Sequence, residues 1–232
     1  MTKHIGIVAC SAEGAALCYR TICVEGANIL GRYAHPEVTM HTFPLSEYTR
    51  CLESGDWGGV ADLMISSVDK LASVGADFAI CPDNTIHQVF DLVVKKSPIP
   101  WLHIADEVIG EAKRQNYKRL GVLGTRFLME GPVYTAKLNL ENIEYVIPGI
   151  DARERINSII FNELVNSRFS SEARAYFKKV ISRLKKQDCD AVILGCTEIP
   201  LLITPESSPL PTLDSTRLLA RSALNKAVET TS

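Results

Sequence analysis

The sequence of 232 residues lacks the marks of a metalloprotein, a disulfide-exchange protein or a nucleic-acid-binding protein. Its seven cysteines form no Cys-x-x-Cys pair, so zinc binding and thioredoxin-type chemistry have no support. Its formal net charge is only -2, which gives no electrostatic reason to expect nucleic acid or an anionic membrane as a partner. We expect a small-molecule ligand, no bound metal and no nucleic-acid partner.

Long apolar segments are also missing. No run approaches the roughly 18 apolar residues needed to cross a bilayer. The first residues show neither the apolar core nor the small-residue cleavage site of a signal peptide. Hydrophobic residues make up 46% of the chain, which is enough for a substantial core. We therefore expect a cytoplasmic protein in a reducing compartment, with no membrane partner.

Two phosphate-binding motifs are absent as well. The chain contains neither Gly-x-Gly-x-x-Gly nor Gly-x-x-x-x-Gly-Lys-Ser/Thr, so a nucleotide phosphate cradle is not supported. A loop of small residues at 10–14 nevertheless follows the first apolar run at 5–8 and precedes a helix-like stretch. Free backbone N–H groups in such a loop could bind a carboxylate.

Apolar runs alternate with helix-like stretches along the whole chain. The strand signals lie at 5–8, 38–43, 77–82, 101–104, 120–123, 144–147, 191–194 and 212–214. The helix signals lie at 15–30, 56–74, 87–96, 106–116, 134–140, 151–165, 171–186 and 215–228. This alternation predicts an α/β fold with parallel sheets.

The alternation also repeats. Asp83 lies almost as far beyond the strand at 5–8 as Cys196 lies beyond the strand at 120–123. We therefore expect two pseudo-symmetric Rossmann-like domains. The first contains residues 1–98 plus 212–232, and the second contains 99–211. Because ligands in such sheets bind beyond the carboxyl ends of the strands, we expect the active site in the cleft between the two domains.

The stretch Gly195-Cys196-Thr197-Glu198 closes the apolar run 191–194 and precedes a helix-compatible segment. At a strand end facing a helix N-terminus, the amide dipoles favour the thiolate form of a cysteine. The stretch 79–85 has the same layout and places Asp83 after its strand. The sequence thus predicts that the two turns supply the halves of one site.

The residues of these turns resemble the aspartate/glutamate racemase family, within the group that includes hydantoin racemase, maleate isomerase and arylmalonate decarboxylase. The matching stretches are 75–78 with 84–87, 124–127 with 129–130, 193–199 and 214–217. The Gly-Cys-Thr-Glu stretch combined with the upstream Asn84-Thr85 is the most specific part of the likeness.

The resemblance implies a cofactor-independent racemase, often dimeric, in which two cysteines act on opposite faces of the α-carbon. One thiolate removes the α-proton and the other thiol returns a proton. In this sequence the first of these positions holds Asp83, and the second holds Cys196. A carboxylate can also take or give a proton, so we predict that Asp83 and Cys196 form the catalytic pair.

The resemblance also implies a set of substrate-binding residues. They are Ser11, Asn84, Thr85, Thr125, Thr197, Glu198 and Arg50. Each candidate has a plainer interpretation. Asp83 and the hydroxyl residues suit helix caps and turns, Cys196 could be a buried structural thiol, and Arg50 could be a surface charge. The family's basic side-chain binder has no clear equivalent, with Tyr48 in its region and Arg50 close by.

These inferences lead to one function and two alternatives. We predict a racemase of aspartate or glutamate, an isomerase that needs neither pyridoxal phosphate nor metal and that forms a homodimer. The first alternative is a related proton-transfer enzyme, a decarboxylase or a cis/trans isomerase of a dicarboxylate, because a single cysteine suits one-sided chemistry. The second is an inactive small-molecule binding protein.

Overall fold

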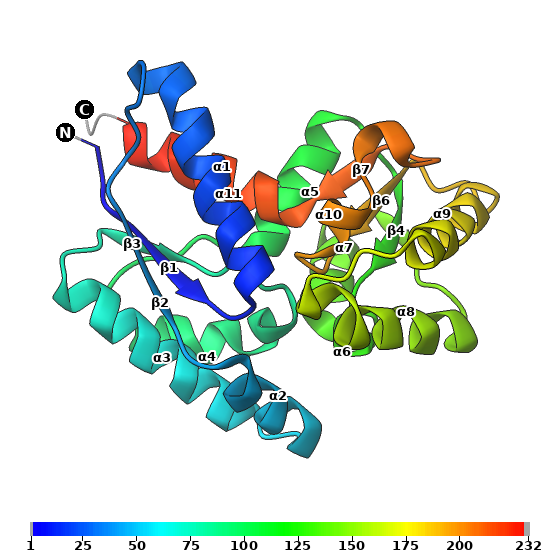
Figure 1. Cartoon of the computed structure of the whole chain (residues 1–232), viewed down its shortest axis with the longest axis horizontal. Coiled ribbons are helices and arrows are strands. Elements are labelled where there is room, and N and C mark those ends of the chain that lie inside the picture. The colour runs from blue at the N-terminus through cyan, green and yellow to red at the C-terminus, as the bar shows by residue number, and fades with distance from the viewer. Residues whose placement is uncertain (1, 230–232) are drawn as a thin grey trace. The chain divides into compact units, whose positions relative to one another are not determined.

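The computed structural model describes residues 2–229, and the chain divides into two compact units (Figure 1). Unit 1 contains the described residues up to Ile104 and those from Thr216 onward. Unit 2 is Ala105–Ser215. The chain therefore crosses between the units after Ile104 and after Ser215, a few residues later in each case than the boundaries at 98/99 and 211/212 that we expected from the sequence.

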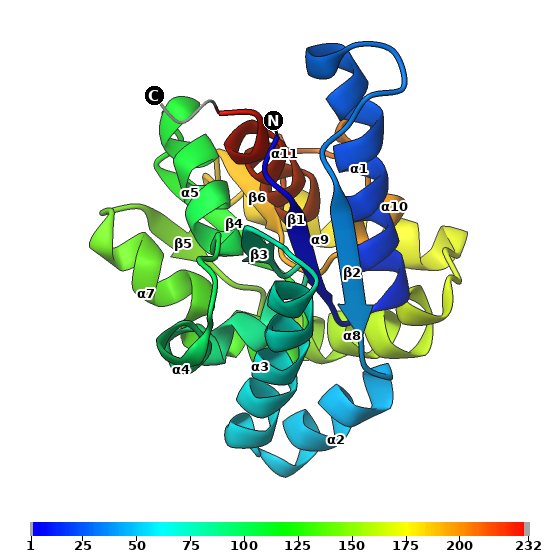
Figure 2. The ribbon, with the colours of Figure 1, turned by 90° about the vertical axis from the view of Figure 1, so that its left-hand side faces the viewer.

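Unit 1 is built on a parallel sheet in which β1 (Ile5–Ala9) lies between β2 (Val38–Thr42) and β3 (Phe78–Ile80) (Figure 2). Beyond β3, Trp101 forms an isolated parallel bridge to Ala79. The segment at 101–104, expected to be a strand entering the second half, therefore extends the first sheet, because the backbone of β3 bonds on both sides of Trp101.

The helices of unit 1 cover both faces of this sheet. They are α1 (Ala12–Leu30), α2 (Leu45–Ser54), α3 (Trp57–Ser73), the 3-10 turn η1 (Thr85–Val89), α4 (Phe90–Lys96) and α11 (Ser215–Val228), whose first residue belongs to unit 2. Apolar side chains of α1 and α11 share one core with Ile5, Ile7 and Phe78. On the other face a side chain at Gly6 would lie 3.3 Å from Leu71 of α3, so α3 packs closely there.

Unit 2 repeats this arrangement. Its parallel sheet has the order β5 (Glu144–Val146), β4 (Arg119–Leu123), β6 (Ala191–Leu194) and β7 (Thr212–Asp214). As in unit 1, the strand that comes first along the chain (β4) lies between the second (β5) and the third (β6). The predicted α/β fold with two similar parallel sheets is therefore confirmed.

The helices of unit 2 are mostly short. They are α5 (Ile104–Arg114), α6 (Arg126–Glu130), α7 (Pro132–Leu140), α8 (Ile150–Asn162), the 3-10 turn η2 (Leu164–Asn166), α9 (Ser171–Lys185), α10 (Ile199–Leu202) and the 3-10 turn η3 (Pro205–Ser207). The main core joins α8 and α9 to β4 and β6 and includes Cys196. A Cβ at Gly121 would lie 2.7 Å from the Leu184 side chain, so α9 packs closely against β4 there. Gly6 of β1 allows the same close packing of α3 in unit 1.

Short polar side chains fix the starts of several helices. Ser11, Thr125 and Ser170 each accept a hydrogen bond from the backbone N–H three residues later, which satisfies one of the free donors of the first turn. The helix expected over 87–96 begins instead as η1, because the turn after β3 is tightened by side-chain contacts described below. Within residues 2–229 none of the helices has the length and apolarity required to span a bilayer.

Candidate active site

In unit 1, polar residues follow the carboxyl ends of the neighbouring strands β1 and β3. Ser11 ends the loop after β1, and its Oγ accepts a hydrogen bond from the Gly14 N–H at 3.3 Å. Asp83 lies three residues beyond β3, and its Oδ1 accepts from the Ile86 N–H at 3.2 Å. Asp83 thus performs the capping role expected of its position, and the carboxyl ends of adjacent parallel strands place it at the same sheet edge as Ser11.

The Asp83 turn is held by a buried histidine. His87 donates Nδ1–H to the Asp83 carbonyl at 2.6 Å, and its Nε2 accepts the Ile104 N–H at 3.3 Å. The ring is therefore the neutral Nδ1–H tautomer. Asn84 and Thr85, which lie between Asp83 and His87 in the sequence, are both buried. The sequence alone does not indicate that His87 links the Asp83 turn to Ile104, because Ile104 lies 17 residues after His87.

Cys81 lies two residues before Asp83 and is completely buried. Burial raises the pKa of the Cys81 thiol well above its usual value, and the nearby Asp83 raises it further. The thiol therefore stays protonated at neutral pH and is a poor base. Of these two side chains, Asp83 is the better candidate for taking a proton.

Tyr48 of α2 lies in the same buried region. Burial is the main cause that raises the pKa of its hydroxyl, with Cys81, Cys10 and Asp83 as weaker causes, so the hydroxyl remains neutral. Tyr48 is 0% exposed, yet its Oη has no hydrogen-bond partner of normal geometry among the described residues. A buried hydroxyl of this kind can donate to a ligand.

Arg50, the other candidate on α2, lies in a different environment. Its side chain is 73% exposed and pairs with Glu47 at 2.6 Å across one helical turn. An exposed pair of this type contributes little stability. The structure therefore places Arg50 on the outer face of α2, whereas Tyr48 points into the unit.

A second group of polar side chains links β2 to α3. His41 Nδ1 is 3.0 Å from the Ser67 Oγ, and Lys70 Nζ is 3.0 Å from His41 Nε2. Partial burial, followed by the charge of Lys70, lowers the pKa of His41. Because Lys70 donates to Nε2, the neutral His41 ring donates from Nδ1 to Ser67.

In unit 2, the corresponding sheet edge carries Cys196. Cys196 lies two residues beyond β6 and is 7% exposed. Its Sγ lies 2.9 Å from Glu198 Oε2, and the Thr197 hydroxyl donates to the same oxygen at 3.2 Å. Thr125, at the end of the neighbouring strand β4, accepts from the Leu128 N–H at 3.1 Å. The predicted unit 2 residues are therefore all at one edge of the sheet.

Two glycines allow the ends of β4 and β6 to approach each other closely. Gly195 N–H donates to the Leu123 carbonyl at 2.7 Å, which ties the end of β6 to the end of β4. A Cβ at Gly195 would lie 2.4 Å from Leu128 and 2.8 Å from the Leu123 carbonyl. A Cβ at Gly124 would lie 2.6 Å from Leu128. Only glycine fits these two positions, so the turn that presents Cys196 depends on them.

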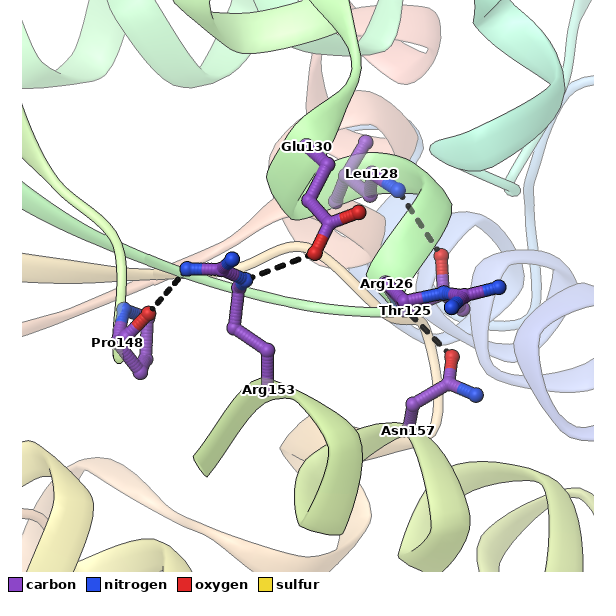
Figure 3. Close-up of polar contacts among 7 residues, drawn as sticks. All are labelled: Thr125, Arg126, Leu128, Glu130, Pro148, Arg153 and Asn157. Carbon is purple, nitrogen blue, oxygen red and sulfur yellow. Dashed lines mark hydrogen bonds and ion pairs between the residues drawn. The ribbon is translucent and has the colours of Figure 1, made fainter. Parts of the chain in front are cut away.

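The helix after Thr125 is fixed by α8 (Figure 3). The Arg126 N–H donates to Asn157 at 2.9 Å. Arg153 pairs with Glu130 at 2.9 Å and donates to the Pro148 carbonyl at 2.8 Å. These contacts hold both ends of α6 and with them the Thr125 cap, so Arg153 supports this sheet edge from outside.

The described residues offer no evident metal site, since no three His, Cys, Asp or Glu side chains among them gather in a way that could hold an ion. All seven cysteines are free thiols. The chemistry available at the two sheet edges is therefore that of a carboxylate, a thiol and neutral hydrogen-bonding groups. These are the groups needed for acid/base proton transfer.

Comparison with known proteins gives the family of this chain. The family model described as Asp/Glu/hydantoin racemase matches residues 10–223. The chain belongs to the Asp/Glu/hydantoin racemase family. Among curated proteins of this kind, it is 26% identical over 162 residues to the broad specificity amino-acid racemase RacX of Bacillus subtilis, covering 70% of each chain. Amino-acid racemases are isomerases, so this family membership places the chain among isomerases.

Solved structures agree with the family and the fold. The chain matches a Yersinia pestis protein, provisionally assigned as an Asp/Glu racemase, with a TM-score of 0.88, 30% identity, and coverage of 98% of this chain and 100% of the other. An aspartate racemase homologue from Pyrococcus horikoshii matches with a TM-score of 0.84, 26% identity, and coverage of 99% and 100%. A Francisella tularensis glutamate racemase in complex with D-glutamate shares the fold, with a TM-score of 0.70 and 16% identity over 99% of this chain and 84% of that one.

Proposed function

We propose that this protein racemises aspartate or glutamate without a cofactor, using Asp83 and Cys196 as the two acid/base groups. The observation that carries the proposal is the equivalent position of these residues. Each follows the third strand of its unit, and the first three strands of each unit have the same order in their sheet. Membership of a racemase family is consistent with this assignment, because inversion by proton transfer requires an acid/base group on each side of the α-carbon.

In this mechanism Asp83 removes the α-proton on one face and Cys196 returns a proton on the other, or the reverse. The reference pKa values are about 3.9 for Asp and about 8.5 for Cys, so the two groups differ as acids by several pH units. Because the two groups differ, the maximal rates in the two directions need not be equal. Burial keeps the Cys81 thiol protonated, which leaves Asp83 as the unit 1 base.

Polar groups at the strand ends would bind the substrate and stabilise the charge that develops as the α-proton leaves. The candidates are Ser11, Asn84, Thr85, Thr125 and Thr197. Backbone N–H groups at the start of α1, a helix of 19 residues, favour an anion beside Ser11. Hydrogen-bond donors aimed at a developing enolate contribute much of the rate in such reactions. Exclusion of water would strengthen each of these contacts.

The side-chain carboxylate of the substrate has two candidate partners on α2. Arg50 would form a charge-assisted pair, but it must first leave Glu47. The buried Tyr48 hydroxyl lies close to Asp83, and its interaction with the Ser67 side chain falls outside normal hydrogen-bond geometry. We favour Tyr48 as the direct contact. Arg50 remains a candidate that would act after a side-chain movement.

The function is tested by incubating each enantiomer of aspartate and glutamate with the wild-type protein in heavy water. We expect inversion accompanied by deuterium at the α-carbon for at least one of the two amino acids. α-Deuterium without inversion would favour a one-sided enzyme such as a decarboxylase or a cis/trans isomerase. That alternative is favoured by the carboxylate at the first catalytic position. Binding without exchange would indicate an inactive binding protein.

We also propose that the protein works as a homodimer in the reducing cytoplasm. Seven free thiols support a reducing compartment, since disulfides persist mainly in oxidising ones. The dimer rests on the family resemblance alone. Sedimentation equilibrium at micromolar concentration tests it, and a single species with the 25.5 kDa mass of the monomer would contradict it.

A further inference from the structure

Four polar side chains of unit 1 form a row that begins at the exposed Lys70 and ends at the buried hydroxyl of Tyr48. Lys70 Nζ lies 3.0 Å from His41 Nε2, and His41 Nδ1 lies 3.0 Å from Ser67 Oγ. Ser67 is 0% exposed and also interacts with the Tyr48 hydroxyl, outside normal hydrogen-bond geometry. The Phe43 ring centroid lies 4.9 Å from that of His41 and 4.4 Å from Lys70 Nζ, so Phe43 packs against the exposed end.

The donors and acceptors of these groups fix the direction of the contacts. An ammonium group has three donors and no acceptor, so Lys70 donates to His41 Nε2. The neutral His41 ring then carries its proton on Nδ1 and donates it to Ser67 Oγ. Because the Ser67 oxygen accepts on this side, its own hydrogen can be directed to the Tyr48 oxygen. Partial burial and the Lys70 charge lower the pKa of His41, which agrees with a neutral ring.

The same direction decides what the Tyr48 hydroxyl offers to a ligand. With Ser67 directed to its oxygen, Tyr48 has its own O–H left to donate. This hydroxyl is fully buried and has no partner of normal geometry within residues 2–229, and such a group calls for an acceptor. Cys10, which follows β1, and Asp83 both influence the Tyr48 hydroxyl, so it lies near this edge of the unit 1 sheet. A carboxylate oxygen suits this position better than an ammonium group does.

We propose that the row orients the Tyr48 O–H as a donor to the side-chain carboxylate of the substrate. Lys70, His41 and Ser67 are then positioning residues, an inference that rests on the racemase function proposed above. Because all donors in the row point the same way, each bond polarises the next, and the positive end of the row faces the ligand. The row thus brings the influence of a surface cation to a buried group without the cost of burying the cation.

A simpler explanation is that Lys70 acts through its charge alone. Its ammonium group would then attract the substrate carboxylate across space, and the side chains between them would have no effect on binding. Ser67→Ala separates the two explanations, because it breaks the row and leaves the cation in place. Ser66→Ala, on the same helix α3, is the matched control.

The test is a double-mutant cycle on the full protein, with KM and kcat measured for aspartate and glutamate. Tyr48→Phe should raise KM by at least about tenfold with little change in kcat, because the lost contact binds substrate and transition state alike. Ser67→Ala and Lys70→Met should each raise KM by at least about threefold. Adding either of them to Tyr48→Phe should cause no further loss. Lys70→Arg and Ser66→Ala should keep the wild-type KM.

NMR of protein labelled at tyrosine Cζ examines the row without turnover, with Tyr48→Phe used for assignment. In the free protein, Ser67→Ala and Lys70→Met should both shift the Tyr48 signal, and Ser66→Ala should not. Lys70 is exposed, so Lys70→Met tests the row even if Ser67→Ala fails to fold.

Three results would overturn the inference and leave the racemase function standing. They are a Tyr48 signal that is the same in the wild type and Lys70→Met, a wild-type KM in folded Ser67→Ala, and additive losses when Ser67→Ala is combined with Tyr48→Phe. A Tyr48 signal that responds to both variants in a protein that racemises no amino acid would refute the proposed function and leave the row intact.

Discussion

At the scale of single residues, burial and neighbouring side chains distinguish two of the thiols. Cys81 and Cys196 both follow a third strand, but Cys81 is completely buried beside the carboxylate of Asp83, which raises its pKa. Cys196 is slightly exposed and contacts Glu198. We therefore propose that Asp83 transfers the proton in unit 1 and that Cys81 is a packing residue.

The first prediction follows from this difference. Cys81→Ala should keep turnover within about threefold of the wild type, because the thiol takes no part in proton transfer and the substitution removes a single buried atom. Circular dichroism and a urea titration would check that the variant is folded. A loss of turnover comparable to that of Cys196→Ser in the folded Cys81→Ala protein would show that Cys81 is the unit 1 base.

A second prediction at this scale concerns pH. Burial and Lys70 lower the pKa of His41 in the folded state, so the unfolded chain takes up its proton first as the pH falls below about 6.5. The stabilising contribution is present above that pH and is lost as the pH falls toward the lower, folded value. Lys70→Met removes the cation, so the pKa of His41 should rise in an NMR titration. Lys70→Arg, which keeps the charge, is the control, and an unchanged pKa in Lys70→Met would contradict the assigned cause.

At the scale of elements, the sequence predicts strand and helix order well, because each buried strand is a short apolar run and the capping residues are visible. It predicts pairing less well. The run at 101–104 carries the pattern of a strand, yet it is only a bridge at the edge of the first sheet, since sheet order depends on contacts between distant segments.

The same limit applies to the site. The positions of Asp83, Cys196, Ser11 and Thr125 after strands could be predicted from the local pattern. The clamp of His87 onto Ile104 and the burial of Tyr48 could not, because both depend on side chains that pack across a long stretch of chain. Because Glu198 is only two residues after Cys196, the sequence indicates that the two residues are near each other. It does not indicate that the Glu198 carboxylate points to the sulfur, because that depends on the geometry of the turn.

A prediction at the scale of elements concerns the packing around Gly195, which follows β6. Gly195→Ala would place a Cβ within 2.4 Å of Leu128, so we expect a loss of about 1–3 kcal/mol of stability from overpacking. Gly110→Ala is the matched control. It lies inside α5 with only the end of Arg114 nearby, so it should stabilise the protein by up to about 1 kcal/mol. Chemical denaturation measures both, and an unchanged stability in Gly195→Ala would show that the turn can relax.

At the scale of the whole molecule, the chain builds unit 1 from both of its ends. Leu219 and Ala223 of α11 pack against β1 in the unit 1 core, and Arg221 pairs with Glu25 of α1. Residues that follow unit 2 in the chain thus complete the core around a sheet that begins at Ile5. The chain cannot form unit 1 from its first hundred residues alone without exposing this apolar face.

Hydrogen exchange tests this dependence. Leu219→Ala should cost about 2–5 kcal/mol, because the side chain is completely buried, and the amides of β1 should lose protection. The amides of β6, which lie in the separate core of unit 2, should keep most of theirs. Equal loss of protection in both strands would show that the two units unfold as one cooperative body.

We propose that Asp83 and Cys196 form one two-sided catalyst. The most direct measurement compares the wild type, Asp83→Asn and Cys196→Ser in heavy water, following chirality and α-deuterium together with each enantiomer of aspartate and glutamate. We predict that the wild type inverts at least one of these amino acids and that each variant loses inversion by at least about 100-fold. Wild-type inversion that survives in either folded variant would contradict the claim.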